Sequence, residues 1–286
     1  MKGIIYFFIF IIAFLGLAVA VVFVKHEFIP VIETKSGGQK QIPSDMKMDI
    51  LKDGATTEIP TYKVPILMYH YVEYVADLKD TIRVSLNVNP DVFEEQIKTL
   101  IANDYTFMTA KELGEVLDNK MKMPAKPILL TFDDGHWDFD TEVLPILKKY
   151  NVKATAYIIT GFIGGSDFMT KEQLQDVVSS GLVDVGAHTV HHIALSGRLY
   201  LVQKYEIEQS KSWLENNYNI NVVSFAYPEG SFDRQAADIV KGAGYTTAVS
   251  TIAGESQSLE NRFYLYRLRP GYRTGISLTN FIDSTQ

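Results

Sequence analysis

Apolar and polar positions alternate in blocks along residues 64–251, and the blocks predict strands and helices in turn. Short apolar runs predict buried strands at 64–72, 127–132, 153–160, 182–188, 222–228 and 245–251. Segments with helical spacing lie between them at 90–104, 141–151, 170–181, 201–219 and 234–244. Because strands and helices alternate, we expect an α/β fold with a mainly parallel sheet, closed or nearly closed into a (β/α) barrel.

The helix at 170–181 carries signals at both of its ends. Thr170 stands at the N-cap position, and Gln173 follows at the third position after it, as in a capping box. Gly181 is suited to the left-handed conformation that often ends a helix.

An apolar stretch without charge, residues 3–24, precedes these blocks. It is long enough to cross a membrane as a helix, which takes about 20 residues, and is longer than the core of a usual signal peptide. Ala18-Val19-Ala20 resembles a cleavage site, but the apolar run continues to Val24. We therefore expect an uncleaved, single-pass transmembrane helix, with the rest of the chain outside the cytoplasm.

The segment after the apolar stretch is polar and has no sustained apolar period. We interpret residues 25–62 as a stalk between a membrane anchor at 1–24 and a folded domain at 63–286. The chain has no cysteine, which excludes disulfides and thiolate metal sites. Its net charge is −7 and it has no long basic block, so we do not expect nucleic-acid binding.

Two adjacent acids, Asp133 and Asp134, follow the expected strand at 127–132 and precede Gly135. Asp-Gly pairs are common in turns that carry no chemistry, so this motif alone favours an ordinary turn. The C-terminal ends of barrel strands are, however, where such folds carry reactive residues. A second group of residues has to decide between the two interpretations.

A histidine pair supplies that second group. His188 and His192 follow the expected strand at 182–188, and a helical turn would place residues four apart on one face. Surface histidines are the plain alternative. Two histidines and one carboxylate form a common hydrolytic zinc set, and a second acid suits the acceptor of a water proton. We expect His191 to point away from such a site, and Thr189 either to orient the turn or simply to cap it.

The stretch TFDDG, the His-x-x-x-His pair and a later proline-containing strand end occur in this order. Together they resemble the polysaccharide deacetylases of carbohydrate esterase family 4, the NodB-homology domain. The stretches VPILMYHYV and FAYPEGSFD are similar to the branch that includes bacterial poly-N-acetylglucosamine deacetylases. The resemblance spans residue 64 to the C-terminus and implies a distorted (β/α) barrel that hydrolyses N-acetyl groups on a polymeric amino sugar.

The resemblance also implies roles for individual residues. Asp133 becomes the general base, and Asp134, His188 and His192 become ligands of a divalent ion, usually zinc. In FAYPEG, Tyr227 and Glu229 become substrate and oxyanion contacts, the latter through its backbone N–H.

The third motif of that family usually carries an arginine that orients the base, and an aromatic residue. Ala226 and Glu229 stand at these positions here. We expect Arg267 to replace the missing arginine, with Arg269 as the second choice. A surface salt bridge is the plain alternative for each of them.

The family's fifth motif supplies a histidine near the C-terminus as acid for the leaving amine. No histidine follows His192 in this chain. That acid is therefore absent or comes from elsewhere, and His70, at the end of the strand at 64–72, is the available substitute. A buried structural histidine is its plain alternative. His136 lies beside the acid pair in the chain, with its side chain free in this interpretation to face solvent.

These observations predict a membrane-anchored deacetylase that acts on N-acetylglucosamine in a cell-wall or extracellular polysaccharide. Two alternatives stay open. One is a catalytically weak or inactive barrel that binds wall polysaccharide, and the other is a metal-dependent hydrolase of a small exported amide.

Overall fold

The computed structural model describes residues 41–47 and 59–284. The expected anchor at 1–24 and most of the expected stalk at 25–62 lie outside the described residues. In the described part of the chain, no helix combines the length and the apolar character needed to cross a membrane. The stalk region contributes the short helix α1 (Ser44–Lys47) and the strand β1 (Tyr62–Lys63), which pairs antiparallel with β9 (Ser256–Gln257).

The other described strands form one eight-stranded sheet in which every pair is parallel. Its members are β2 (Ile66–Tyr69), β3 (Thr106–Met108), β4 (Pro127–Phe132), β5 (Ala154–Ile158), β6 (Val183–Ala187), β7 (Ser224–Ala226), β8 (Thr247–Ala253) and β10 (Leu265–Arg267). Their order is β10-β8-β7-β6-β5-β4-β2, and β3 pairs with β4.

The two ends of this sheet meet. Leu67 in β2 forms a parallel bridge with Leu268, the residue that follows β10. Leu268 donates to the carbonyl of Ile66 at 2.8 Å and accepts from Met68 at 2.9 Å. The sheet therefore closes on itself, and the expected (β/α) barrel is confirmed.

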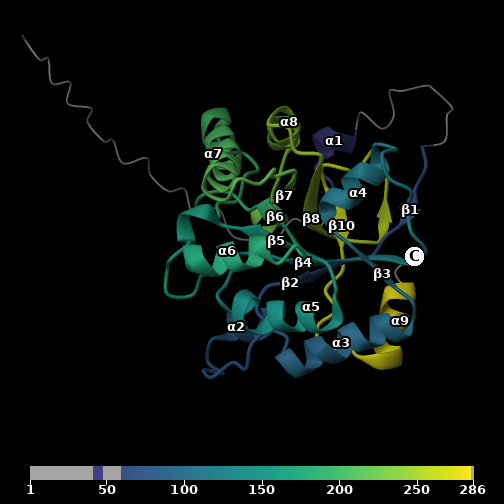
Figure 1. Cartoon of the computed structure of the whole chain (residues 1–286). Coiled ribbons are helices and arrows are strands. Elements are labelled where there is room, and N and C mark those ends of the chain that lie inside the picture. Colours follow the sequence, from purple (N-terminus) through teal and green to yellow (C-terminus); the bar gives the residue numbers. More distant parts are fainter. Residues whose placement is uncertain (1–40, 48–58, 285–286) are drawn as a thin grey trace, which may run out of the picture. The chain divides into compact units, whose positions relative to one another are not determined.

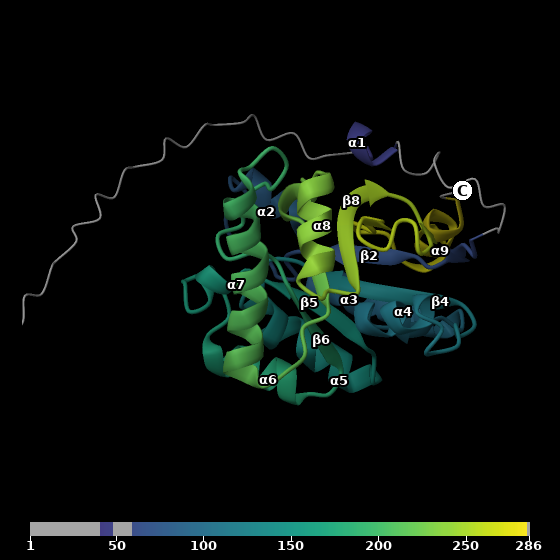
Figure 2. The ribbon, with the colours of Figure 1, turned by 90° about the horizontal axis from the view of Figure 1, so that it is seen from above.

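Helices cover the outside of this barrel (Figures 1 and 2). The longer ones are α3 (Pro90–Ala102), α4 (Ala110–Leu117), α5 (Leu144–Tyr150), α6 (Lys171–Ser179), α7 (Tyr200–Tyr218), α8 (Arg234–Gly242) and α9 (Gly275–Ser284). The shorter ones are α2 (Thr81–Leu86), the π-helical turn η1 (Phe139–Val143), and the 3-10 turns η2 (Thr160–Phe162) and η3 (Pro228–Gly230). Figure 2 shows α7 and α8 side by side.

Local signals in the sequence account for several of these boundaries. β4 spans the same residues as the predicted strand. The capping box at the start of α6 is confirmed, because the Thr170 hydroxyl accepts from the Gln173 N–H at 3.2 Å and the Gln173 side chain accepts from the Thr170 N–H at 2.9 Å. Gly181 has a φ of 69°, as expected for a residue that ends a helix.

Alternation along the strands separates two apolar layers. One cluster contains Leu129, Tyr157, Val249 and Leu265, which come from strands around the barrel and meet in its interior. The neighbouring positions of the same strands pack against the surrounding helices in a second, larger cluster. Apolar side chains of α4 belong to the inner cluster and fill one end of the barrel.

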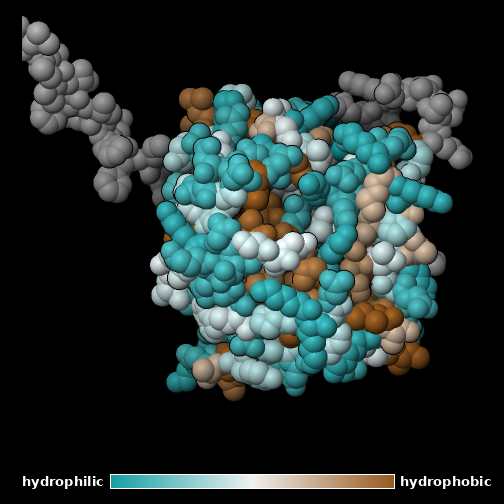
Figure 3. All heavy atoms as spheres, viewed as in Figure 1, coloured by the Kyte–Doolittle hydropathy of each residue, from teal (hydrophilic) through white to brown (hydrophobic). Residues whose placement is uncertain are grey.

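Hydrogen bonds hold α4 at the end where the strands begin. The N–H of Ala110 donates to the Thr155 hydroxyl at 2.9 Å, and the N–H of Lys111 donates to Asp184 at 3.3 Å. Because α4 closes the amino-terminal end of the barrel, polar chemistry is confined to the opposite end, where the strands finish. Polar side chains cover most of the face in Figure 3, and apolar ones show in a hollow near its centre and in patches at its edges.

Asp184 provides a test of this arrangement. Its burial raises the pKa of its carboxyl to about 7. An acid whose pKa is raised by folding costs stability once the pH exceeds its unfolded-state value, so the cost grows between about pH 4 and pH 7. We expect Asp184→Asn to raise the Tm at pH 8, by about 2–4 °C for each kcal/mol relieved, and to leave it unchanged at pH 4. Thermal unfolding at both pH values checks this, and a lower Tm of the variant at pH 8 would show that the carboxylate stabilises the start of α4 instead.

Candidate active site

The turn after β4 separates the two acids. Asp133 continues the alternation of β4 into the barrel, and its N–H donates to the carbonyl of Tyr69 at 3.0 Å. Asp134 and Gly135 have φ angles of 77° and 82°, in the left-handed region that residues other than glycine rarely adopt. β5 runs parallel to β4, so this Asp-Asp-Gly stretch does not form a hairpin.

Arg267, a buried arginine from β10, binds the carboxylate of Asp133. Nη1 and Nη2 of Arg267 each donate to one carboxylate oxygen, both at 2.7 Å. Nε of the same guanidinium donates to the Ser250 carbonyl at 2.7 Å, and Nη1 also lies 3.2 Å from the Thr131 hydroxyl. Both side chains are almost fully buried. This two-pronged geometry fixes the orientation of the Asp133 carboxylate.

The arginine also decides the charge of Asp133. Burial alone would raise the pKa of this carboxyl, but the charge and hydrogen bonds of Arg267 outweigh it and lower the pKa below its ordinary value. Among the described residues, both hydrogen bonds to the Asp133 side chain come from Arg267. Arg269, our second choice to replace the missing arginine, is exposed. Asp133 is therefore an ionised carboxylate in a buried position.

Three side chains that could bind a metal ion converge beside the Asp133 carboxylate, and we call them the donor cluster: Asp134, His188 and His192. Ligand atoms of Asp134, His188 and His192 all lie within 4.8 Å of one another. Nε2 of His188 lies 3.4 Å from Oδ1 of Asp134, and Nε2 of His192 lies 3.3 Å from the same oxygen. This is a two-histidine, one-carboxylate set of the kind that binds zinc.

The protonation pattern of this cluster fits a cation. Nδ1 of His188 lies 2.7 Å from the carbonyl of Ala226, an acceptor, so Nδ1 carries a proton and Nε2 is the nitrogen that faces Asp134. Burial acts to lower the pKa of His188, but the hydrogen bond to Asp134 and the neighbouring carboxylates outweigh it and raise the pKa. Burial, with the neighbouring His188, lowers the pKa of His192 to about 4, which keeps that ring neutral. Oδ1 of Asp134 is buried and has no hydrogen-bond partner in the described part of the chain. A buried carboxylate oxygen without a hydrogen-bond partner, facing two imidazole nitrogens, fits a metal ion that would replace a proton there.

An irregular loop, not a helical turn, brings the two histidines together. Thr189 and His192 both have positive φ angles, 66° and 53°, so our expectation of a helical turn is wrong. The Thr189 hydroxyl donates to the carbonyl of His188 at 2.5 Å and accepts from the N–H of His192 at 2.9 Å. Thr189 therefore holds the backbone of this loop by local bonds, which are compatible with both interpretations that we left open for it.

Glu206 in α7 holds the middle of the same loop. One of its carboxylate oxygens accepts from the N–H groups of Val190 and His191, both at 2.9 Å, and the other lies 2.7 Å from Nδ1 of His191. His191 thus points toward α7 and away from the donor cluster. A buried glutamate in the middle of a helix gives no signal in the sequence, and we did not predict this contact.

His70, the expected acid, lies at the end of β2 beside the acid pair. Its Nε2 is 3.9 Å from Oδ2 of Asp133, and 14% of its side chain is exposed. Burial is the main influence and lowers the pKa of His70, although the carboxylates of Asp134 and Asp133 act in the opposite direction. The structure therefore brings His70 to the same end of the barrel as Asp133, Asp134, His188 and His192.

The residues of FAYPEG differ in what they offer. The side chain of Tyr227 is fully buried and stacks on Phe232 at 4.8 Å, and its N–H donates to the Val249 carbonyl. Our expectation that Tyr227 contacts substrate is therefore wrong, because the alternation of β7 turns it toward the outer core. Glu229 is exposed in the turn that follows and has a φ of 57°, a conformation that directs its backbone out of the strand.

His136 was not among the expected site residues, and its side chain is buried instead of facing solvent. It is 4% exposed, and its Nε2 lies 3.3 Å from Oδ2 of Asp134. Its ring lies between Tyr71 and Phe168. Only contacts with these distant residues decide the direction of the side chain, so the local sequence carries no signal for it.

Comparisons with known proteins agree with this geometry. A family model for polysaccharide deacetylases matches residues 120–248. YxkH of Bacillus subtilis (strain 168), a protein assigned to the polysaccharide deacetylases, is 31% identical over 257 residues, which cover 89% of this chain and 88% of YxkH. This chain belongs to the polysaccharide deacetylase family.

Further relatives of this chain are similar in sequence and in structure. The poly-beta-1,6-N-acetyl-D-glucosamine N-deacetylase of Staphylococcus aureus (strain MSSA476) is 28% identical over 195 residues, covering 64% of this chain and 67% of that protein. The structure of the Streptococcus pyogenes deacetylase PplD in complex with acetate matches with a TM-score of 0.72 at 32% identity. This match covers 79% of this chain and 100% of PplD.

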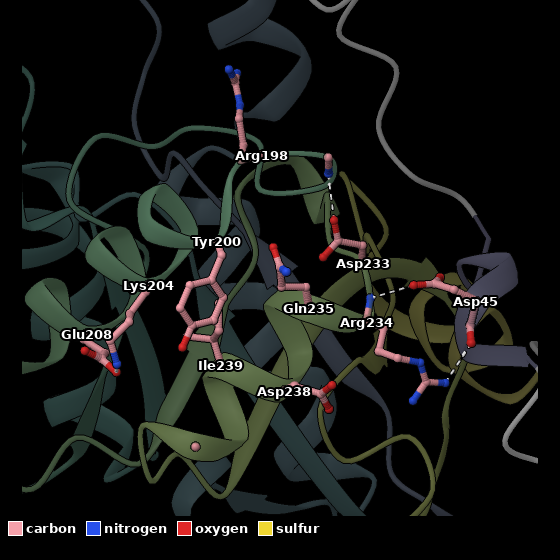
Figure 4. Close-up of a pocket in the computed structure, with 12 residues that line it drawn as sticks. Asp45, Arg198, Tyr200, Lys204, Glu208, Asp233, Arg234, Gln235, Asp238 and Ile239 are labelled. Carbon is pink, nitrogen blue, oxygen red and sulfur yellow. Dashed lines mark hydrogen bonds and ion pairs between the residues drawn. The ribbon is translucent and has the colours of Figure 1, made fainter. Parts of the chain in front are cut away.

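A surface groove of this protein lies apart from the acid pair. It has a volume of about 780 Å³ and runs between α7 and α8 (Figure 4). Several of its polar groups already have partners: Lys204 donates to Glu208, the Arg234 guanidinium donates to the backbone carbonyl of Asp45 in α1, and the Asp45 carboxylate accepts from the Arg234 N–H. None of the candidate site residues lines it, and we assign it no role in the chemistry.

The pair of Arg267 and Asp133 predicts a stability effect that does not depend on activity. Arg267→Met leaves a buried carboxylate without its counter-charge, and we expect the free energy of unfolding to fall by about 3–5 kcal/mol. Adding Asp133→Asn to that variant should recover a large part of the loss, because the unpaired charge disappears. Urea unfolding at pH 7 of the wild type, both single variants and the double variant measures this, and strictly additive losses would contradict the pairing.

Proposed function

We propose that this chain is a metal-dependent deacetylase that removes N-acetyl groups from N-acetylglucosamine in an extracellular or cell-wall polysaccharide. The observation that carries the proposal is the ionised, arginine-bound Asp133 beside the cluster of Asp134, His188 and His192. A carboxylate that stays charged beside three potential metal ligands suits hydrolysis of an amide.

We propose Asp134, His188 and His192 as the ligands of a zinc or other divalent ion. When bound, such an ion supplies Lewis-acid polarisation of the amide carbonyl and a water of lowered pKa. The carbonyl of Ala226 holds His188 in the tautomer that presents Nε2, and Thr189 holds the backbone of His192 in place.

Asp133 serves as the general base in this proposal. Arg267 keeps its carboxylate ionised and fixed in orientation, so the group is ready to accept the proton of the attacking water. The backbone N–H of Glu229 is the proposed donor to the oxyanion that develops on the amide oxygen.

His70 is the proposed source of the proton for the leaving amine. Its position 3.9 Å from Asp133 supports this role, since a proton received by the base lies close to the imidazole. The lowered pKa of His70 means that the ring is neutral in the resting state and has to gain a proton during the reaction before it donates one.

The relatives support the proposed substrate class. The Staphylococcus aureus relative is named for poly-beta-1,6-N-acetyl-D-glucosamine, and this supports a polymeric amino sugar here. We propose that residues 1–24 anchor the enzyme in the cell membrane with the barrel outside the cytoplasm, where such polymers are found. Each hydrolysed acetamide leaves a free amine, so the neutral polymer becomes cationic.

Acetate release tests the proposed function. The full-length chain, incubated with zinc and oligomers of N-acetylglucosamine, should release acetate, and a chelator should stop the release. Asp133→Asn removes the base but none of the ligands, so we expect turnover to fall by about 10²–10⁴-fold with the bound metal retained. Loss of metal from this variant would contradict the assigned role, and bound metal without acetate release in the wild type would favour a barrel that only binds polysaccharide.

The donor cluster can be tested by metal content alone. His188→Ala removes one of three ligands, and we expect the purified variant to lose its metal on dialysis. His191→Ala is the matched control, because that ring faces Glu206 and not the cluster. Metal analysis of both variants should show loss in the first and retention in the second, and equal retention in the two would exclude His188 as a ligand.

A further inference from the structure

His136 lies in a continuous stack of four side chains. Its ring is 3.9 Å from the ring of Tyr71 and 4.9 Å from that of Phe168, with interplanar angles of 24° on both sides. The guanidinium of Arg83 covers the other face of Tyr71 at 4.5 Å. Stacking on both faces leaves the imidazole little freedom to rotate.

The edges of the same ring meet two oxygen acceptors. Nδ1 of His136 lies 3.1 Å from the carbonyl of Asp167, and Nε2 lies 3.3 Å from Oδ2 of Asp134. Each nitrogen of the ring therefore faces one oxygen atom. The stack and these two contacts together fix the position of Nε2 beside Oδ2 of Asp134.

That oxygen is the one that the two histidines do not face. His188 and His192 both approach Oδ1 of Asp134, whereas His136 approaches Oδ2. Among the described residues, the potential ligand atoms that lie within 4.8 Å of one another belong to Asp134, His188 and His192, and His136 is not one of this group. His136 is thus a partner of a ligand and not a fourth ligand.

An outer contact braces this arrangement. Arg83 lies 3.2 Å from the carboxylate of Asp167, the residue whose carbonyl meets Nδ1 of His136. The backbones on the two sides are also joined, since Trp137 donates to the Asp167 carbonyl at 3.2 Å and Met169 to the Gly135 carbonyl at 3.0 Å. Arg83 of α2 therefore contacts both the Tyr71 ring of the stack and Asp167, the residue whose carbonyl meets His136.

We propose that His136 is a positioning residue for the metal site. It occupies Oδ2 of Asp134, so that Oδ1 is directed at His188 and His192 and the site is assembled before a metal arrives. Hydrogen-bonded partners of metal ligands typically change metal affinity about 10–100-fold when removed. The inference rests on the metal site of the proposed function.

Three substitutions at one position separate hydrogen bonding from packing. His136→Phe keeps an aromatic ring in the stack and removes both nitrogens. His136→Asn retains a donor near the place of Nδ1 only, and His136→Gln retains one near the place of Nε2. We expect zinc affinity to fall about 10–100-fold in the Phe and Asn variants and to be largely rescued in the Gln variant.

Competition for zinc against a chromophoric chelator measures these affinities on the full-length chain, and the Tm of each metal-free variant shows whether packing has changed. A Gln variant as weak as the Asn variant, or a Phe variant with wild-type affinity, would overturn the proposal, as would losses that follow the Tm. If the Phe variant does not fold, the comparison of Asn with Gln decides alone. A wild type that binds no zinc would refute the proposed metal site itself, which is a different outcome.

Discussion

The contact between Arg267 and Asp133 is the interaction on which the site depends. An ionised carboxylate inside a barrel is tolerated only where a matching charge and hydrogen bonds compensate for the lost water. Arg267 provides these at 2.7 Å to both oxygens, and it reaches them because Leu265 and Arg267 lie on the inner face of β10. The bridge from Leu268 to Leu67 joins the end of this strand to β2, and β4 is the next strand, so the arginine reaches Thr131 and Asp133. Closure of the fold and the charge of Asp133 are therefore linked, because the same short strand provides both.

The short stretch from Asp133 to Asp138 supplies four polar side chains with four different tasks. Asp133 points inward to Arg267, and the positive φ of Asp134 turns its carboxylate toward the histidine loop. His136 turns back to Oδ2 of Asp134. Asp138, which is 2% exposed, accepts from the N–H of Val72 and so holds the segment that carries His70 and Tyr71. Such division of work requires the left-handed turn, because a continued strand would send neighbouring residues to only two faces.

Local patterns in the sequence were sufficient for the barrel and for the residues at strand ends. β4 and the capped start of α6 follow from apolar runs and from Thr170 with Gln173. Arg267 was expected only because the related motif lacks its arginine, and β10, at three residues, is too short to show a pattern. Tyr227 was misassigned because alternation within a three-residue strand does not reveal which face is inner.

Contacts across long sequence distances explain the rest. The direction of His136 depends on Phe168 and Tyr71, and the shape of the histidine loop depends on Glu206 in α7. No periodicity in the chain records these contacts, since each side chain in isolation is compatible with an exposed surface.

The most direct measurement is the anomalous diffraction of crystals of this protein that contain zinc, collected on both sides of the zinc absorption edge. The account predicts one peak about 2.0–2.2 Å from Oδ1 of Asp134 and from Nε2 of His188 and His192, with Arg267 still bound to both oxygens of Asp133. A peak coordinated by Asp133, or one at His191 and Glu206, would contradict it.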